Sequence, residues 1–124
     1  MSLILIADDD AQNLYLVNFL LKQKGHSVVE ARDGREVVAA AMSEGFELIL
    51  MDIQMPVMNG LDATRLIKQY DGSVKIIALT AKAMAGDREL IVSAGCDGYI
   101  EKPIDPLNFI GQVEGFLGES RCVS

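Results

Sequence analysis

The sequence predicts an α/β protein with a doubly wound parallel sheet, covered on both faces by helices. Two observations favour this fold: five short apolar runs occur along the chain, and segments with helical spacing alternate with them. Continuous apolar runs are typical of strands that are buried on both faces, as in a parallel sheet. Five strand–helix units in strict alternation therefore imply one sheet with helical crossovers.

The five predicted strands are runs of four or five residues. They cover residues 3–7, 27–30, 47–51, 75–79 and 98–101. The segments between them have about the length that a crossover between parallel strands requires. Helices are predicted over residues 11–24, 33–44, 61–70 and 84–93, with a last helix that starts at 106.

Apolar spacing predicts which side of each helix faces the sheet. The expected inner residues are Leu14, Val17, Leu20 and Leu21 in the first helix, Val37, Val38, Ala41 and Met42 in the second, and Leu107, Ile110 and Val113 in the last.

Helix boundaries carry capping signals. Asp33 and Glu36 have a spacing like that of a capping box, and Asp105 followed by Pro106 is typical of the start of a helix. Asp10 is a candidate cap for the first helix. Glycines are expected to end four helices, because glycine tolerates the left-handed conformation found there. These glycines are Gly25, Gly45, Gly72 and Gly95.

Length and composition indicate one domain over residues 1–124, with a core over about 3–117 and a short tail over 118–124. A formal charge of −7 argues against direct binding to nucleic acid or to an anionic membrane. No apolar run approaches the roughly 20 residues of a membrane span, and no signal peptide is recognisable. Cys96 and Cys122 are expected as free thiols of a cytoplasmic protein. His26, the only histidine, is expected on the surface.

Acidic residues follow two of the predicted strands directly. Asp8, Asp9 and Asp10 follow the first strand, and Asp52 follows the third. Because ligands of open α/β sheets bind at the carboxyl ends of the strands, we expect Asp8, Asp9 and Asp52 in one crevice, with these two strands as neighbours. Carboxylates repel by roughly 4 kcal/mol per pair at ~4 Å and an effective dielectric near 20. A Mg²⁺ ion would offset that repulsion.

Two further strand ends carry polar side chains. Thr80 ends the fourth strand, and Lys102 follows the fifth. Carboxylates, a hydroxyl and an ammonium group around one crevice suit phosphoryl transfer, which depends on positioning and charge neutralisation. Asp52 is the candidate nucleophile and would form an acyl phosphate. The segment 52–60, with its proline and final glycine, is expected to leave the site along a fixed path.

With these residues in place, the chain resembles a two-component response-regulator receiver domain of the chemotaxis-regulator type. The segments 8–13 and 79–84 most resemble receivers of phosphorelays and hybrid histidine kinases. The resemblance implies a flavodoxin-like fold with strand order 2-1-3-4-5 and five helices. It further implies the following roles: Asp8 and Asp9 as metal-binding acid pair, Asp52 as phosphoacceptor, the Gln54 backbone carbonyl as further ligand of Mg²⁺ or Mn²⁺, Thr80 and Tyr99 as switch residues, and Lys102, with a cis bond to Pro103, as catalytic lysine.

The resemblance also implies a signalling role rather than a metabolic enzyme. A histidine kinase or histidine phosphotransfer domain would donate the phosphoryl group, docking at the first helix near Asn13, Leu14, Tyr15 and Val17. The fourth helix, fifth strand and fifth helix would then present a changed surface to a downstream protein, as a monomer or a weak activation-dependent dimer. Gln54 and Lys82 would tune the lifetime of the acyl phosphate.

Other readings stay open at this point. A phosphatase of the haloacid-dehalogenase type also forms a phospho-aspartate, but it normally needs an Asp where this chain has Gln54. A flavin-binding electron carrier would need a Ser/Thr/Gly-rich phosphate loop in place of the three aspartates after the first strand. A purely structural domain leaves the acid cluster unexplained. The chain is expected to be either a stand-alone regulator or a receiver from a larger protein.

Overall fold

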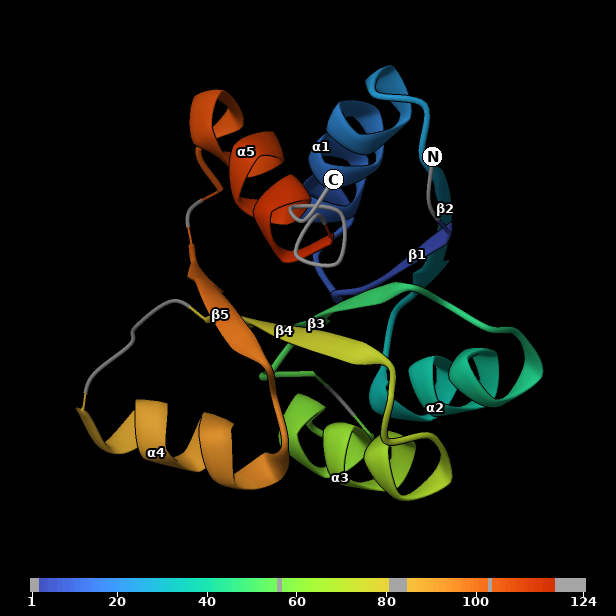
Figure 1. Ribbon diagram of the computed structural model, residues 1–124, viewed down its shortest axis with the longest axis vertical. Helices are drawn as coiled ribbons and strands as arrows, with labels where there is room; N and C mark the ends of the chain where they lie inside the picture. The colour runs from blue at the N-terminus through green and yellow to red at the C-terminus, as the bar shows by residue number, and fades with distance from the viewer. Residues whose placement is uncertain (1–2, 56, 81–84, 103, 118–124) are drawn as a thin grey trace, which may run out of the picture.

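The computed structural model describes residues 3–55, 57–80, 85–102 and 104–117, without the side chains of 85–87. Five strands alternate with five helices in these ranges, as Figure 1 shows. The elements are β1 (Leu3–Ala7), α1 (Ala11–Gln23), β2 (Ser27–Ala31), α2 (Gly34–Ser43), β3 (Leu48–Asp52), α3 (Gly60–Tyr70), β4 (Lys75–Thr80), α4 (Ala85–Ala94), β5 (Gly98–Glu101) and α5 (Pro106–Leu117).

The five strands form one parallel sheet in the order β2-β1-β3-β4-β5. This confirms the predicted fold class and strand order. The pairing of Ala7 with Met51 aligns the ends of β1 and β3, so the acidic residues that follow or end these strands lie next to each other. The prediction that the first and third strands are neighbours is therefore confirmed.

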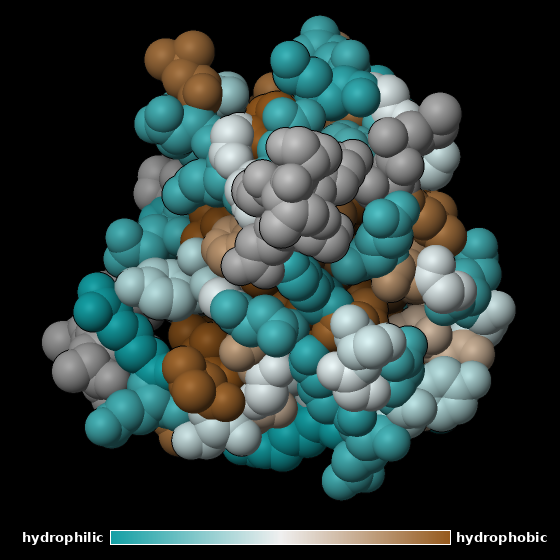
Figure 2. Space-filling view, viewed as in Figure 1, coloured by the Kyte–Doolittle hydropathy of each residue, from teal (hydrophilic) through white to brown (hydrophobic). Residues whose placement is uncertain are grey.

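Helices form a layer on each face of the sheet: α1 and α5 on one face, and α2, α3 and α4 on the other (Figure 1). Side chains alternate along each strand, so the core has two halves. Ile4 and Ile6 of β1 pack on the α1 and α5 side, whereas Leu5 and Ala7 pack on the opposite side. All four are fully buried. On the molecular surface shown in Figure 2, hydrophilic residues are spread widely, with smaller hydrophobic areas between them.

The predicted caps are confirmed at three helices. Asp10 Oδ1 accepts a hydrogen bond from the N–H of Gln12, Asp33 Oδ1 from that of Glu36, and Asp105 Oδ1 from that of Leu107. The terminating glycines are only partly as expected. Gly25 and Gly95 adopt positive φ angles of 85° and 107°, but Gly45 and Gly72 do not. At those two sites the helix has already ended, with Glu44 and Asp71 as extended C-cap residues.

Several burial predictions were wrong. Leu107 is 92% exposed, and Phe109 takes the core position in α5. Met42 in the last turn of α2 is 42% exposed. Leu14 and Val17 are buried, as expected for the inner side of α1, so they offer no surface for the docking that was also expected of them.

The expectation for His26 was also wrong. His26 is 8% exposed, and its Nε2 lies 3.8 Å from Glu114 Oε2 of α5. The glycine turn before it indicated a surface position, but the contact with Glu114 places His26 beside α5.

Some expectations concern positions outside the described residues: the start of the fourth helix at 84, the role of Lys82, the Lys102–Pro103 bond and the state of Cys122. Within the described ranges, none of the helices is long and apolar enough to cross a membrane.

Candidate functional site

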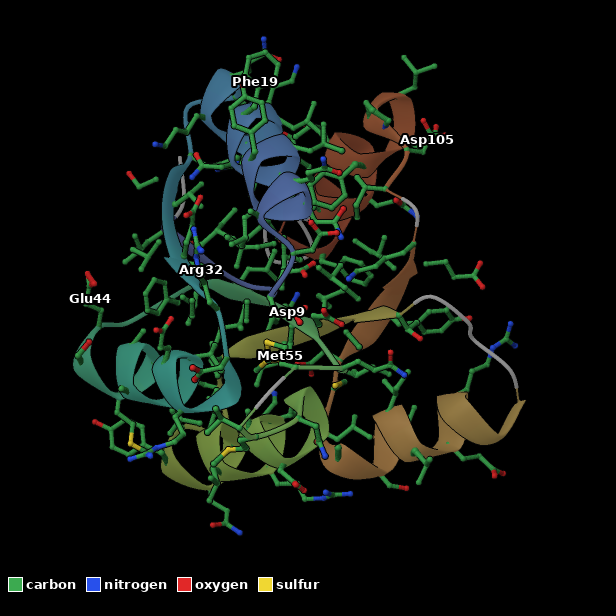
Figure 3. The ribbon with its side chains drawn as sticks, turned by 180° about the vertical axis from the view of Figure 1, so that it is seen from behind. Asp9, Phe19, Arg32, Glu44, Met55 and Asp105 are labelled. Atoms are coloured by element: carbon green, nitrogen blue, oxygen red, sulfur yellow. The ribbon has the colours of Figure 1, made fainter. Side chains whose placement is uncertain are left out.

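The candidate site lies at the carboxyl edge of the sheet, where four neighbouring strands end. Asp8 follows β1, Asp52 and Thr80 are the last residues of β3 and β4, and Lys102 follows β5. Figure 3 labels Asp9 where the chain passes from β1 to α1, and Met55 in the loop after β3. The sheet topology therefore brings together side chains that are far apart in the sequence.

Three carboxylates form a compact cluster. One oxygen of each of Asp8, Asp9 and Asp52 lies within 4.8 Å of the others. Asp8 is fully buried and Asp52 is 6% exposed, whereas Asp9 is exposed. Tight turns fix the two buried groups: the N–H of Asp10 donates to Asp8 Oδ1 (2.9 Å), and the N–H of Gln54 donates to Asp52 Oδ1 (3.1 Å).

Lys102 supplies the positive charge that faces this cluster. Its Nζ lies 3.0 Å from Asp8 Oδ2 and 3.2 Å from Asp52 Oδ2. The Asp8 contact is an ion pair, and Asp8 Oδ2 accepts no hydrogen bond from the described residues. Burial alone would lower the pKa of Lys102. The contact with Asp8 and the charges of Asp52 and Asp8 outweigh burial and raise the pKa above its ordinary value of 10.5.

The Asp52 carboxyl is the group whose protonation the site perturbs most clearly. Burial raises its pKa from an ordinary value of 3.8 to about 6. The hydrogen bond from Gln54 acts against that change, the negative charge of Asp8 adds to it, and Lys102 again lowers the pKa. Asp52 is therefore held in a site that penalises its charge when no further cation is present.

The donor set fits a hard divalent cation. Three carboxyl groups face one ammonium group, so acidic groups are in excess at the cluster. Oxygen ligands of this kind are those that Mg²⁺ uses in proteins. The structure thus brings together Asp8, Asp9 and Asp52 as the sequence predicts.

The other predicted residues lie around the same edge. Thr80 is 3% exposed, and its carbonyl accepts a 2.8 Å hydrogen bond from the N–H of Lys102. Tyr99 is half-buried on β5 and pairs with Ala78 in register. Gln54 holds Asp52 through its N–H, and its side chain is exposed. The carbonyl of Gln54 as a metal ligand stays a prediction.

Two glycines that position the site were not singled out for their packing by sequence reasoning. A Cβ on Gly60 would collide with the backbone oxygen of Asp52, and one on Gly34 would collide with the backbone oxygen of Met58. Glycine thus allows α2 and α3 to start against the loop that follows Asp52. The only sequence signal was the Asn59–Gly60 pair, in which Asn59 caps α3 by accepting from the N–H of Asp62.

Val57 in this loop adopts a φ angle of +70°, which is unfavourable for a β-branched residue. Its side chain is 71% exposed, so little packing depends on it. Val57→Asn should therefore raise the free energy of unfolding by about 1 kcal/mol, because asparagine tolerates this conformation. Urea unfolding measures the change. Val57→Ala is the control: it keeps a Cβ without the amide, so its free energy of unfolding should rise by less. A Val57→Asn variant that is less stable than the wild type would contradict the prediction.

Comparison with known proteins supports one family. The family model of the response regulator receiver domain matches residues 4–114. The chain belongs to the response regulator receiver domain family. This confirms the resemblance seen in the sequence and leaves the phosphatase and flavin-carrier readings without support.

Relatives of this receiver domain include a curated regulator and solved structures. It is 37% identical over 119 residues to the polar-differentiation response regulator DivK of Brucella anthropi, covering 94% of this chain and 97% of DivK. A CheY-like receiver domain protein from Methanospirillum hungatei has a TM-score of 0.91 at 29% identity, covering 100% and 99%.

A third relative is the receiver domain of sensor histidine kinase PA1611 from Pseudomonas aeruginosa, with a magnesium ion in its active-site cleft. It has a TM-score of 0.87 at 33% identity, covering 95% of this chain and 98% of that one.

Proposed function

We propose that this receiver domain accepts a phosphoryl group on Asp52 from a phosphohistidine donor, and that the modification changes the surface formed by α4, β5 and α5. The observation that carries the proposal is the cluster of Asp8, Asp9 and Asp52, with Lys102 Nζ 3.0 and 3.2 Å from two of them. Family membership supports the signalling role, and the residue roles are our assignment.

Asp8, Asp9 and Asp52, with the backbone carbonyl of Gln54, would hold Mg²⁺ or Mn²⁺. When bound, the ion would neutralise charge on the cluster and on the phosphoryl oxygens. The magnesium ion in the related PA1611 receiver supports this assignment. The donor set of hard oxygens supports it independently.

In the transfer step, an Asp52 carboxylate oxygen attacks the phosphorus of the donor. A P–O bond forms as the P–N bond of the phosphohistidine breaks, and the electron pair of that bond returns to the imidazole nitrogen. Lys102, already beside Asp52, pairs with the added negative charge. Thr80 at the end of β4 donates its hydroxyl to a phosphoryl oxygen.

The proposed switch uses Thr80 and Tyr99, and their position on neighbouring strands β4 and β5 supports it. As Thr80 moves toward the phosphoryl group, the ring of Tyr99 turns inward, and the surface of α4, β5 and α5 changes. This is a shift between two packings, driven by contacts that only the phosphorylated site provides. A downstream protein reads that surface.

A histidine kinase or a histidine phosphotransfer domain is the proposed donor. Asn13 and Tyr15 of α1 stay available for docking, with Tyr15 73% exposed. We further propose a single cytoplasmic domain, monomeric or weakly dimeric when activated, without direct nucleic-acid or membrane partners. Its only chemistry is its own phosphorylation and dephosphorylation. The proposal holds for a stand-alone regulator and for a receiver unit of a larger protein.

Intact-protein mass after incubation with phosphoramidate, a small donor with a P–N bond, tests the proposal. One phosphoryl adduct that needs Mg²⁺ and is absent in Asp52→Asn is expected. Asp62→Asn is the matched control, because Asp62 is an exposed aspartate of α3 that pairs with Arg65 away from the cluster. No adduct on the wild-type chain under any condition would overturn the proposal.

A further inference from the structure

Arg88 of α4 lies over the half-buried ring of Tyr99. Its guanidinium carbon lies 5.6 Å from the ring centroid, within the range of a cation–π contact. Among the described residues, no carboxylate forms an ion pair with Arg88. The contact that the structure shows for the Arg88 guanidinium is therefore the ring of Tyr99.

Tyr99 and Thr80 share one face of the sheet. Ala78 pairs with Tyr99 and Thr80 pairs with Glu101, and side chains two residues apart on a strand point to the same face. Ala78 and Tyr99 belong to the half of the core that faces α2, α3 and α4, whereas Leu79 and Ile100 belong to the other half. Figure 1 places α4 on the same side of the sheet. Arg88 thus contacts the ring from the helix layer that covers this face.

We propose that Arg88 is a positioning residue that holds Tyr99 in its resting place and so opposes the switch. This rests on the proposed function, in which the ring moves toward Thr80 after phosphorylation. We assign the observed contact to the resting state and expect the movement toward Thr80 to separate the ring from Arg88, so that the contact stabilises the resting state alone. A ligand or substitution shifts a two-state equilibrium only through such a difference between the states.

Loss of the contact should make the switched state easier to reach. Arg88→Met keeps a long, flexible side chain without the charge. In saturating Mg²⁺ it should raise the affinity for beryllofluoride, a phosphoryl mimic, about two- to fivefold, the ratio that an exposed cation–π contact supports. Arg88→Lys should restore part of the wild-type affinity. Arg65→Met is the matched control, because Arg65 is an exposed arginine that pairs with Asp62 rather than with an aromatic ring.

A second measurement follows the ring itself. Labelling with 3-fluorotyrosine gives Tyr99 a ¹⁹F resonance, which is assigned by its loss in Tyr99→Phe. In ligand-free Arg88→Met, this resonance should move toward the position that it has in the beryllofluoride-bound wild type. Tyr15 and Tyr70 serve as internal references. In a Tyr99→Leu background, Arg88→Met should no longer change the affinity.

The outcomes separate the two proposals. A wild-type chain that does not bind beryllofluoride would contradict the proposed function. A Tyr99 resonance that differs between the ligand-free wild type and ligand-free Arg88→Met would then still support the contact, and identical resonances would contradict it. If the wild type binds but Arg88→Met binds equally or more weakly, with Tyr99 unmoved, the role of Arg88 is refuted and the proposed function stands.

Discussion

Replacing Lys102 with methionine is expected to destabilise the metal-free domain by on the order of 2 to 3 kcal/mol. Lys102 Nζ is the cation between Asp8 and Asp52, both nearly or fully buried. Without it, two buried carboxylates face each other uncompensated. The loss should stay below that of a fully buried pair, because the Lys102 side chain is 17% exposed.

Urea unfolding in a chelating buffer at about pH 7 measures this change. Lys24→Met is the matched control, because Lys24 is exposed at the end of α1, away from the carboxylate cluster. Added Mg²⁺ should recover part of the lost stability in Lys102→Met, since a divalent cation offsets the same repulsion. The stability lost on Lys102→Met should also be smaller in an Asp52→Asn background, which removes one of the two negative charges. If Lys102→Met costs as much stability in that background as in the wild type, this account is contradicted.

Asp52→Asn should have the opposite effect and stabilise the metal-free domain. The pKa of Asp52 is raised from 3.8 to about 6, so the folded state disfavours the charged carboxylate. At about pH 7 the carboxyl is ionised in both states, and the wild type bears the full penalty, on the order of 2 to 3 kcal/mol. Asparagine avoids the charge and can keep the hydrogen bond from the N–H of Gln54.

The pH dependence has a definite sign. As pH falls through about 6, the folded wild type takes up a proton before the unfolded chain does, so the wild type gains stability relative to Asp52→Asn. Below about 3.8 both states are protonated and the difference should vanish. Unfolding free energies of the two proteins between about pH 4 and pH 8 measure it. If the difference in unfolding free energy between the wild type and Asp52→Asn stays constant with pH, the charge on Asp52 is not the cause of that difference.

The sequence predicted the fold class and the position of the acid cluster because both depend on local pattern plus one topological rule, whereas the full strand order came from the resemblance to receiver domains. The apolar runs set the strand bounds to within one residue, as at residues 47–51 against the observed Leu48–Asp52. Asp8 and Asp52 then meet because parallel strands end at the same edge of the sheet. Their approach needed no knowledge of side-chain packing.

Helix orientation was less predictable. The expected stripe in α5 stepped by three residues from Leu107 to Val113, and such steps fall short of a turn of about 3.6 residues. The stripe therefore drifts around the helix, and Leu107 ends on the solvent side while Phe109 is buried. The prediction for His26 was wrong for another reason: its side chain lies beside Glu114 of α5, which is far along the chain and leaves no local signal near His26.

The charge balance of the site also lay beyond the sequence. Lys102 was expected near the crevice as a partner for phosphoryl oxygens, but its contacts with both Asp8 and Asp52 depend on side-chain placement. The contact between Arg88 and Tyr99 likewise depends on how α4 packs beside β5. Neither has a spacing signal in the sequence.

The central claim is that Asp52 itself carries the phosphoryl group as an acyl phosphate. Borohydride reduces an acyl phosphate to an alcohol, which converts the modified aspartate into homoserine. After reaction with phosphoramidate and Mg²⁺, peptide mapping by tandem mass spectrometry should find homoserine at position 52 alone. Homoserine at position 8 or 9, or at none of the three, would contradict the account.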